Sequence, residues 1–152
     1  ISAQKSNNPV TQKIFMLSLN HGLRPDDASY AYAVIPGITE KVIEDVIKTS
    51  PYSIVMNNRN IQAVFHPGDT SLGIVFHEAG RFKWKNWQVE TDRPCILLIR
   101  HHKEDWIMAV ADPTSKTGMM KLKIKLSGRR LQEMEVSLPE GLYAGASKII
   151  ML

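Results

Sequence analysis

The amino-acid sequence predicts an all-β fold that contains one short helix. Most of its apolar stretches are short and alternate apolar with polar residues at a period of two, which is typical of strands. Only one segment has helical periodicity, and no run approaches the roughly 18 apolar residues of a membrane span. We therefore expect an all-β chain with no membrane partner.

Ten segments are predicted to be strands, and turn-forming clusters of Ser, Pro, Gly and Asp separate several of them. In chain order the segments are Lys13–Leu19, Ser29–Ile35, Tyr52–Met56, Ile61–Phe65, Leu72–Phe76, Ile96–Arg100, Trp106–Ala111, Lys121–Leu126, Glu133–Leu138 and Lys148–Leu152.

The exception to the strand pattern is the segment 38–48. Its apolar residues fall on one helical face, and they are Ile38, Val42, Ile43, Val46 and Ile47. Thr39 stands where a helix is capped, and Glu44 precedes Lys48 at the favourable spacing of four. We predict a helix over residues 38–48 that links two β regions and has a packing role.

One hairpin is specified more closely than the others. Pairing Leu126 with Gln132 sets Lys123 opposite Glu135 and Lys125 opposite Glu133, and it gathers the apolar residues on the other face. The alternating lysines are also a hypothetical site for an anionic chain, although two of them face carboxylates in this pairing.

Charge and cysteine content narrow the class of protein. The chain has 152 residues, a formal net charge of +4 and a single cysteine, Cys95, so no internal disulfide forms. The charge permits contact with a polyanion without requiring it, and no basic region carries the interleaved aromatics of a nucleic-acid platform. The chain begins at Ile1 with neither an initiator Met nor a signal-peptide pattern, so we expect a piece of a longer protein.

The histidines indicate neither a metal site nor a common catalytic motif. The five are His21, His66, His77, His101 and His102, and none has HxxxH or HExxH spacing. P-loop, GxGxxG and GxSxG patterns are absent as well. We therefore expect no metal, no cofactor, and no nucleotide-binding or hydrolase site of these classes.

His21 and Gly22 form the most suggestive local feature, because they follow a predicted strand and precede Tyr30 and Tyr32 on one face of the next. A histidine at a strand end is a hypothetical general base or sugar contact, and paired tyrosines are suited to stacking on a ligand. The alternative is a turn at Gly22, with His21 bonded to its backbone and both tyrosines in a sheet interface.

The segment 81–87 combines basic and aromatic side chains. Trp84 and Trp87 are three apart, so a regular strand would point them to opposite faces, one into the core and one outward. An exposed tryptophan among cations suits an acidic carbohydrate, and the alternative is packing between domains. The candidate glycan-binding residues are Trp84, Trp87, Arg81, Lys83 and Lys85.

The order of several short motifs resembles the C-terminal part of polysaccharide lyase family 8, which contains the hyaluronate, chondroitin AC and xanthan lyases. The motifs are Asn20-His-Gly22, Pro25, Ala28-Ser-Tyr-Ala-Tyr32, Pro36, Ile54-Val-Met-Asn-Asn58, Gln62-Ala-Val64, Val110-Ala-Asp-Pro-Thr114 and Leu138-Pro-Glu-Gly-Leu142. The resemblance runs from about residue 15 to the chain end.

The resemblance implies a parent with an N-terminal α/α toroid, a central β-sandwich and a C-terminal antiparallel β-sandwich. Residues 1–50 would be the last strands of the central sandwich with the linking helix 38–48, and residues 51–152 the C-terminal β-sandwich domain. Partners implied are an anionic polysaccharide and the missing toroid and central domain, and the implied location is extracellular or periplasmic.

The resemblance also implies the parent's reaction, β-elimination at C5 of a uronate. The family's catalytic Asn, His, Tyr and Arg lie outside this stretch, so we assign no catalytic residue and expect this chain to be inactive alone. His21, Gly22, Tyr30, Tyr32, Asn57 and Gln62 match family motif positions with an expected structural role.

Two alternative hypotheses for the function are a carbohydrate-binding module and a purely structural domain. A sandwich without its neighbours exposes apolar surface, so we also expect self-association.

Overall fold

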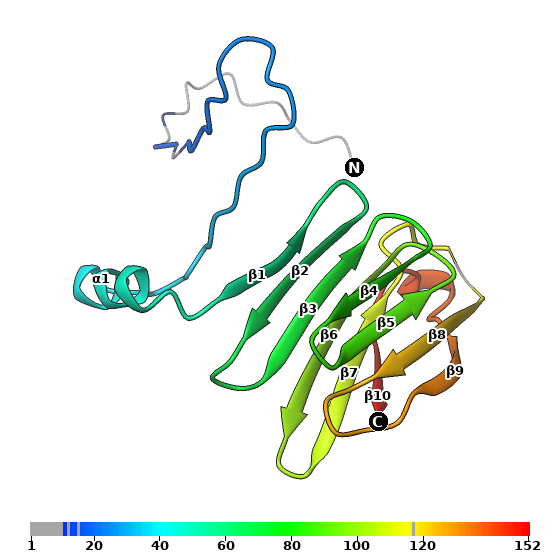
Figure 1. Ribbon diagram of the computed structural model, residues 1–152. Coiled ribbons are helices and arrows are strands. Elements are labelled where there is room, and N and C mark those ends of the chain that lie inside the picture. Colours follow the sequence, from blue (N-terminus) through cyan, green and yellow to red (C-terminus); the bar gives the residue numbers. More distant parts are fainter. Residues whose placement is uncertain (1–10, 12, 15, 117) are drawn as a thin grey trace. The chain divides into compact units, whose positions relative to one another are not determined.

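The computed structural model describes residues 11, 13, 14, 16–116 and 118–152. The chain divides into two units, residues 1–35 and 36–152. The second unit contains every helix and strand that the described residues form (Figure 1). In order they are α1 (Glu40–Thr49), β1 (Ser53–Asn57), β2 (Ile61–His66), β3 (Ser71–Phe76), β4 (Gly80–Trp84), β5 (Trp87–Thr91), β6 (Cys95–His102), β7 (Asp105–Ala111), β8 (Met119–Lys125), β9 (Gln132–Ser137), the 3-10 turn η1 (Gly141–Tyr143) and β10 (Lys148–Met151).

The strands form two antiparallel sheets that face each other, which agrees with the β-sandwich that the family resemblance implies. One sheet has the order β1-β2-β3-β6-β7-β10, and the other has the order β4-β5-β8-β9. Buried side chains from both sheets form one hydrophobic cluster between the layers. In Figure 1 the four-stranded sheet lies over part of one face of the larger sheet.

Period-two alternation places one row of side chains from each strand in this core. The pattern is clearest in β3, where Leu72, Ile74 and Phe76 are buried, and in β6, where Cys95, Leu97 and Ile99 are buried. The intervening residues of both strands point to the opposite face of the sheet. The sandwich therefore has two outer faces, and their chemistry differs.

Two predicted strands are not formed, and two observed strands were not predicted. The segments 13–19 and 29–35 hold no strand in their described residues, and Phe15 of the first lies outside them. Alternation assigns side chains to faces, but a strand also needs a neighbour that accepts its hydrogen bonds, and none of the described strands pairs with these segments. The added strands β4 and β5 include most of the aromatic and basic segment 81–87 and meet at its two-residue turn.

The helix is close to its prediction. It spans Glu40–Thr49 rather than 38–48, with Thr39 at the N-cap but without a side-chain capping hydrogen bond. Ser50 ends it in a left-handed conformation (φ 41°), and its N–H donates to the carbonyl of Val46 at 2.9 Å. No helical residue is buried, so the apolar face of α1 has no cover in the described structure.

The hairpin of β8 and β9 forms with the predicted faces but a shifted register. Gln132 pairs with Ile124 instead of Leu126, so Lys121 lies opposite Glu135 and Lys123 opposite Glu133. A shift of two residues keeps every side chain on its face. The cause is a longer loop, in which the N–H of Arg129 donates to the carbonyl of Leu126 at 3.1 Å.

Candidate functional site

The β4–β5 hairpin carries the glycan-binding candidates and brings its two tryptophans to the same face. Trp84 pairs directly with Trp87, and only Lys85 and Asn86 lie between them. Residues opposite each other in an antiparallel pair share a face. The expectation that the tryptophans point to opposite faces is therefore wrong, because a two-residue turn separates them rather than one continuous strand.

Both tryptophans pack into an aromatic cluster at one end of the core. Phe65 lies 4.9 Å from Trp84 and 6.2 Å from Trp87 between ring centroids, and Trp87 meets Trp106 edge-on at 5.0 Å. Trp87 and Trp106 are only 4% and 7% exposed. Burial of this kind gives Trp87 a packing role.

Trp84 is half-buried, and a cation covers part of its ring. The Nζ of Lys85 lies 4.5 Å from the ring centroid of Trp84, within the range of a cation–π contact. Lys85 holds this position from a left-handed backbone conformation (φ 49°). A ligand that stacked on this face of Trp84 would first have to displace the Lys85 ammonium.

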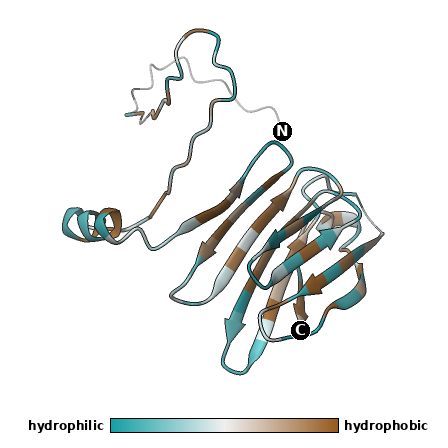
Figure 2. Cartoon of the chain, in the orientation of Figure 1, coloured by the Kyte–Doolittle hydropathy of each residue, from teal (hydrophilic) through white to brown (hydrophobic). Residues whose placement is uncertain are grey.

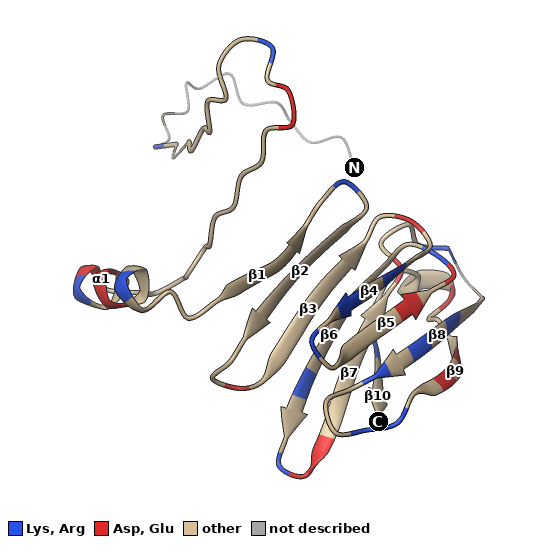
Figure 3. Cartoon of the chain, viewed as in Figure 1, with Lys and Arg blue, Asp and Glu red and all other residues tan. Residues whose placement is uncertain are grey.

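The other cations of the hairpin lie on the outer face of the four-stranded sheet. Arg81 and Lys83 flank the buried Phe82, so they point away from the tryptophans. The sandwich therefore separates the aromatic and basic groups that the sequence places together. Figure 3 shows the resulting bands of basic and acidic residues along β4, β5, β8 and β9.

One row across this outer face alternates in charge. Register aligns Arg81 with Glu90, Glu90 with Lys123, and Lys123 with Glu133. The Nε of Arg81 lies 3.9 Å from a carboxylate oxygen of Glu90, and the Nζ of Lys123 lies 2.9 Å from Glu133. The hydrogen bond to Glu133 raises the pKa of Lys123, and the charge of Glu133 adds to the effect.

The next row has no carboxylate in register. Lys83 pairs with Gln88, and Gln88 pairs with Lys125, so two lysines flank one amide on the same face. With strands about 4.8 Å apart, the two lysines start about 10 Å from each other. We call Lys83, Gln88 and Lys125 the cationic row. Lys85 lies in the adjoining turn between β4 and β5.

The motif residues of the first unit are exposed in the described structure. Gly22 has φ 78° and donates its N–H to Oδ1 of Asn20 at 2.8 Å, so Asn20 rather than His21 closes this turn. The ring of His21 lies 6.0 Å from that of Tyr30, and the rings of Tyr30 and Tyr32 stack at 6.3 Å between centroids. The predicted turn and shared tyrosine side are present, without the predicted strand.

Asn57 and Gln62 pair with each other across the β1–β2 hairpin. Gln62 places Oε1 3.2 Å from Nε2 of His77, and the N–H of His77 donates to the carbonyl of Asn60 at 2.9 Å. These contacts join the β1–β2 turn to the residues that follow β3.

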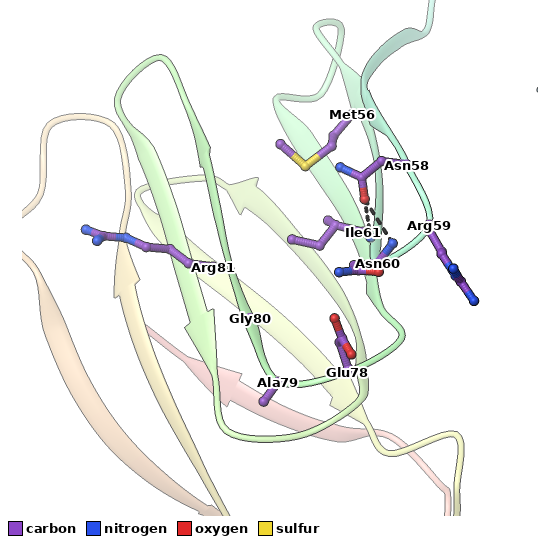
Figure 4. Close-up of a pocket in the computed structure, with 9 residues that line it drawn as sticks. All are labelled: Met56, Asn58, Arg59, Asn60, Ile61, Glu78, Ala79, Gly80 and Arg81. Atoms are coloured by element: carbon purple, nitrogen blue, oxygen red, sulfur yellow. Dashed lines mark hydrogen bonds between the residues drawn. The ribbon is translucent and has the colours of Figure 1, made fainter. Parts of the chain in front are cut away.

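An open pocket lies beside this junction. It has a volume of about 440 Å³ and is lined by Met56, Asn58, Arg59, Asn60, Ile61, Glu78, Ala79, Gly80 and Arg81. Asn58 accepts hydrogen bonds from the backbone N–H groups of Asn60 and Ile61, which fixes the turn. Figure 4 shows Arg59 and Arg81 extending in opposite directions, so the two cations do not converge on one ligand. The sequence did not predict this pocket, because its lining residues come from two separate segments and the only local pattern among them is a polar turn at Asn58–Asn60.

The single cysteine is not an activated nucleophile, and no metal-binding cluster is found among the described residues. Burial raises the pKa of the Cys95 thiol to about 11, so the group is protonated at neutral pH. The buried Asp112 uses Oδ1 to accept hydrogen bonds from the N–H and hydroxyl of Thr114, which shapes the turn after β7. Within the described ranges no group of three or more His, Cys, Asp or Glu could hold a metal ion, and no helix is long and apolar enough to cross a membrane.

Comparison with known proteins finds that two segments of the chain match two domains of one family. Residues 1–47 match the polysaccharide lyase family 8 super-sandwich domain, and residues 53–120 match the polysaccharide lyase family 8 C-terminal β-sandwich domain. The chain belongs to polysaccharide lyase family 8. The sequence resemblance is thus confirmed.

Several family 8 lyases are similar to this chain. The chondroitinase AC of Pedobacter heparinus is 32% identical over 149 residues, which are 97% of this chain. The chondroitin sulfate ABC exolyase of Bacteroides thetaiotaomicron is 28% identical over 64% of the chain, and a hyaluronate lyase of Enterococcus faecalis is 26% identical over 70%. A solved structure of chondroitinase AC lyase, studied with oligosaccharides, covers 84% of the chain at a TM-score of 0.70 and 29% identity.

The chain spans only a small part of these family 8 relatives. It covers 21% of the Pedobacter chondroitinase, 10% of the Bacteroides exolyase and 19% of the chain in the solved structure. What these proteins act on is therefore a property of much longer molecules.

Proposed function

We propose that this chain is the C-terminal part of an enzyme that cleaves chondroitin- or hyaluronan-type polysaccharides by β-elimination. The observation that carries the proposal is the alignment of 97% of the chain with one-fifth of a chondroitinase. In this proposal residues 1–50 end the central sandwich, and residues 51–152 are the C-terminal β-sandwich domain. Because the relatives of this chain are polysaccharide lyases, we also propose an extracellular or periplasmic location.

The catalytic groups, in this proposal, lie outside the chain. Removal of the C5 proton of a uronate needs a base, a group that neutralises the carboxylate and an acid for the leaving oxygen, all in one cleft. The described histidines of the sandwich do not converge in this way. His66 contacts Asp69, His77 contacts Gln62 and His101 packs on Trp106, each in a different place.

The experiment compares the 152-residue chain with the longer protein that carries it. Each is incubated with chondroitin sulfate and hyaluronan, and the ultraviolet absorbance of the new C4–C5 double bond is followed. We expect product with the longer protein and none with the chain alone. Unsaturated product from the purified chain would disprove a purely supporting role, and failure of the longer protein on both glycans would disprove the proposed reaction.

A second candidate function is contact with the anionic glycan itself, and the cationic row favours it. Lys83 and Lys125 both pair in register with Gln88 rather than with a carboxylate, whereas Lys121 and Lys123 are paired with Glu135 and Glu133. A polyanion therefore finds uncompensated charge at this row and compensated charge beside it. In this second candidate function, Trp84 and Trp87 do not contact the glycan, because Trp87 lies in the core and Trp84 packs against it.

Calorimetric titration with chondroitin sulfate, hyaluronan and xanthan tests this candidate. Saturable binding to one glycan should survive near-physiological salt and weaken in the variant Lys83→Ala/Lys125→Ala. The matched control is Lys121→Ala, a lysine of the same face that already has a partner. Binding that salt abolishes for every glycan, or that falls equally in both variants, would leave only general charge attraction.

A further inference from the structure

The side chain at position 88 sets the charge of the cationic row. On the outer face of the four-stranded sheet, Gln88 of β5 pairs with Lys83 on one side and with Lys125 on the other. Two residues along the same strand, Glu90 lies between an arginine and a lysine in the same arrangement. Glutamine is the uncharged isostere of glutamate, so the two rows differ mainly in the charge of their middle residue.

The neighbouring row, which contains Glu90, is compensated internally. The Nε of Arg81 lies 3.9 Å from a carboxylate oxygen of Glu90, and the Nζ of Lys123 lies 2.9 Å from one of Glu133. The hydrogen bond to Glu133 and then its charge raise the pKa of Lys123, and the charge of Glu90 adds to them. An anionic ligand above this row meets two carboxylates among the cations.

The cationic row has no such compensation. Lys83 and Lys125 are exposed, and among the described residues neither forms an ion pair. The half-buried Gln88 between them has an amide that can donate to an anionic oxygen or accept from a sugar hydroxyl. The row therefore offers two ammonium groups and one amide in a line across three strands.

The neighbouring charges also determine the direction that a bound polymer takes. Lys83 and Lys125 are two strand spacings apart, about 10 Å at the backbone, which is close to the length of two linked sugar rings. A polyanion that followed β5 instead would reach Glu90 within two residues, about 7 Å. Repulsion by that carboxylate leaves the direction across the strands, with one anionic group of the polymer at each lysine.

We propose that the cationic row binds a linear polysaccharide with a carboxylate on alternate sugars, lying across β4, β5 and β8, and that the neutral Gln88 permits this binding. The inference rests on the second candidate function, contact with an anionic glycan. It adds the charge spacing of the ligand, its direction on the sheet and the residue that determines whether it binds.

Reciprocal exchange of charge at positions 88 and 90 tests the proposal in the 152-residue chain. The probes are size-defined oligosaccharides of hyaluronan and of chondroitin sulfate, titrated calorimetrically at low salt. Gln88→Glu gives the row the compensated pattern of its neighbour and should weaken binding about tenfold, since a carboxylate beside both lysines offsets their attraction. Glu90→Gln removes the compensation next to the row and should strengthen binding.

The matched control is Asn57→Asp, which adds the same charge at an exposed residue of β1 in the other sheet. It should leave binding unchanged. Urea midpoints show whether each variant is folded, and Gln88→Glu should not lower the midpoint because it sets a carboxylate between two lysines. Should Gln88→Glu fail to fold, the gain or its absence in Glu90→Gln decides the question.

Several outcomes would overturn the proposal. One is unchanged binding by a folded Gln88→Glu variant, and another is equal loss in Asn57→Asp, which would show general repulsion. Binding that requires sulfate and is absent for hyaluronan would overturn the assigned charge spacing. No binding by the unmodified chain would overturn the second candidate function as well, whereas the lyase assay on the longer protein reports separately on the proposed reaction.

Discussion

Trp87 packs at the centre of the aromatic cluster, in contact with Phe65 and Trp106. Its side chain is 4% exposed, so truncation leaves a cavity that neighbouring rings only partly fill. We expect Trp87→Ala to lower the free energy of unfolding by about 3–5 kcal/mol, measured by urea denaturation. The control Tyr143→Ala removes a ring that is 73% exposed and should change stability by less than about 0.5 kcal/mol.

The same residue shows what sequence reasoning could and could not predict about the site. Composition singled out Trp84 and Trp87, but a spacing of three has one meaning within a strand and another across a two-residue turn. Only the pairing of Trp84 with Trp87 distinguishes the two cases. The cationic row was hidden for a related reason, because Lys125 comes next to Gln88 through strand order rather than sequence.

At the scale of elements, the β8–β9 hairpin gives a test of paired against unpaired charge. Lys123 donates to Glu133, whereas Lys125 has Gln88 beside it and no carboxylate in register. We expect Lys123→Gln to lower the urea midpoint more than Lys125→Gln. Salt on the order of 1 M should narrow the difference, because it screens exposed ion pairs.

The pH dependence of this difference follows from the pKa of Lys123. The hydrogen bond to Glu133 raises the folded-state pKa of Lys123 above the ordinary lysine value of 10.5, so the contribution of the pair is fully present below that pH. It is lost as the pH rises through the folded-state pKa, where Lys123 gives up its proton. Equal midpoints for the two variants at neutral pH and low salt would show that the ion pair adds nothing to stability.

Elements also differ in how far the sequence determines them. The strands from β6 to β10 were predicted because each alternates clearly and has a neighbour that completes its hydrogen bonds. The segments 13–19 and 29–35 alternate as clearly, yet their described residues have no strand beside them. Alternation thus predicts a face, and pairing decides whether the strand forms.

For the whole molecule, the outer face of the six-stranded sheet predicts how the chain behaves without the rest of the longer protein. This face carries exposed apolar side chains, and we call it the apolar face (Figure 2); they are Ile54, Val64, Ile96, Leu98 and Ile149. At high concentration another copy can cover this surface, and burying it releases water from both. We expect the weight-average mass of the 152-residue chain, measured by light scattering, to rise with concentration. Leu98→Glu places a charge in the middle of the face and should suppress the rise.

The matched variant Leu131→Glu distinguishes this face from general stickiness. It adds the same charge at an equally exposed leucine outside the face, so it should associate like the unmodified chain. A constant monomer mass across the series, or equal suppression by both variants, would argue against association through the apolar face.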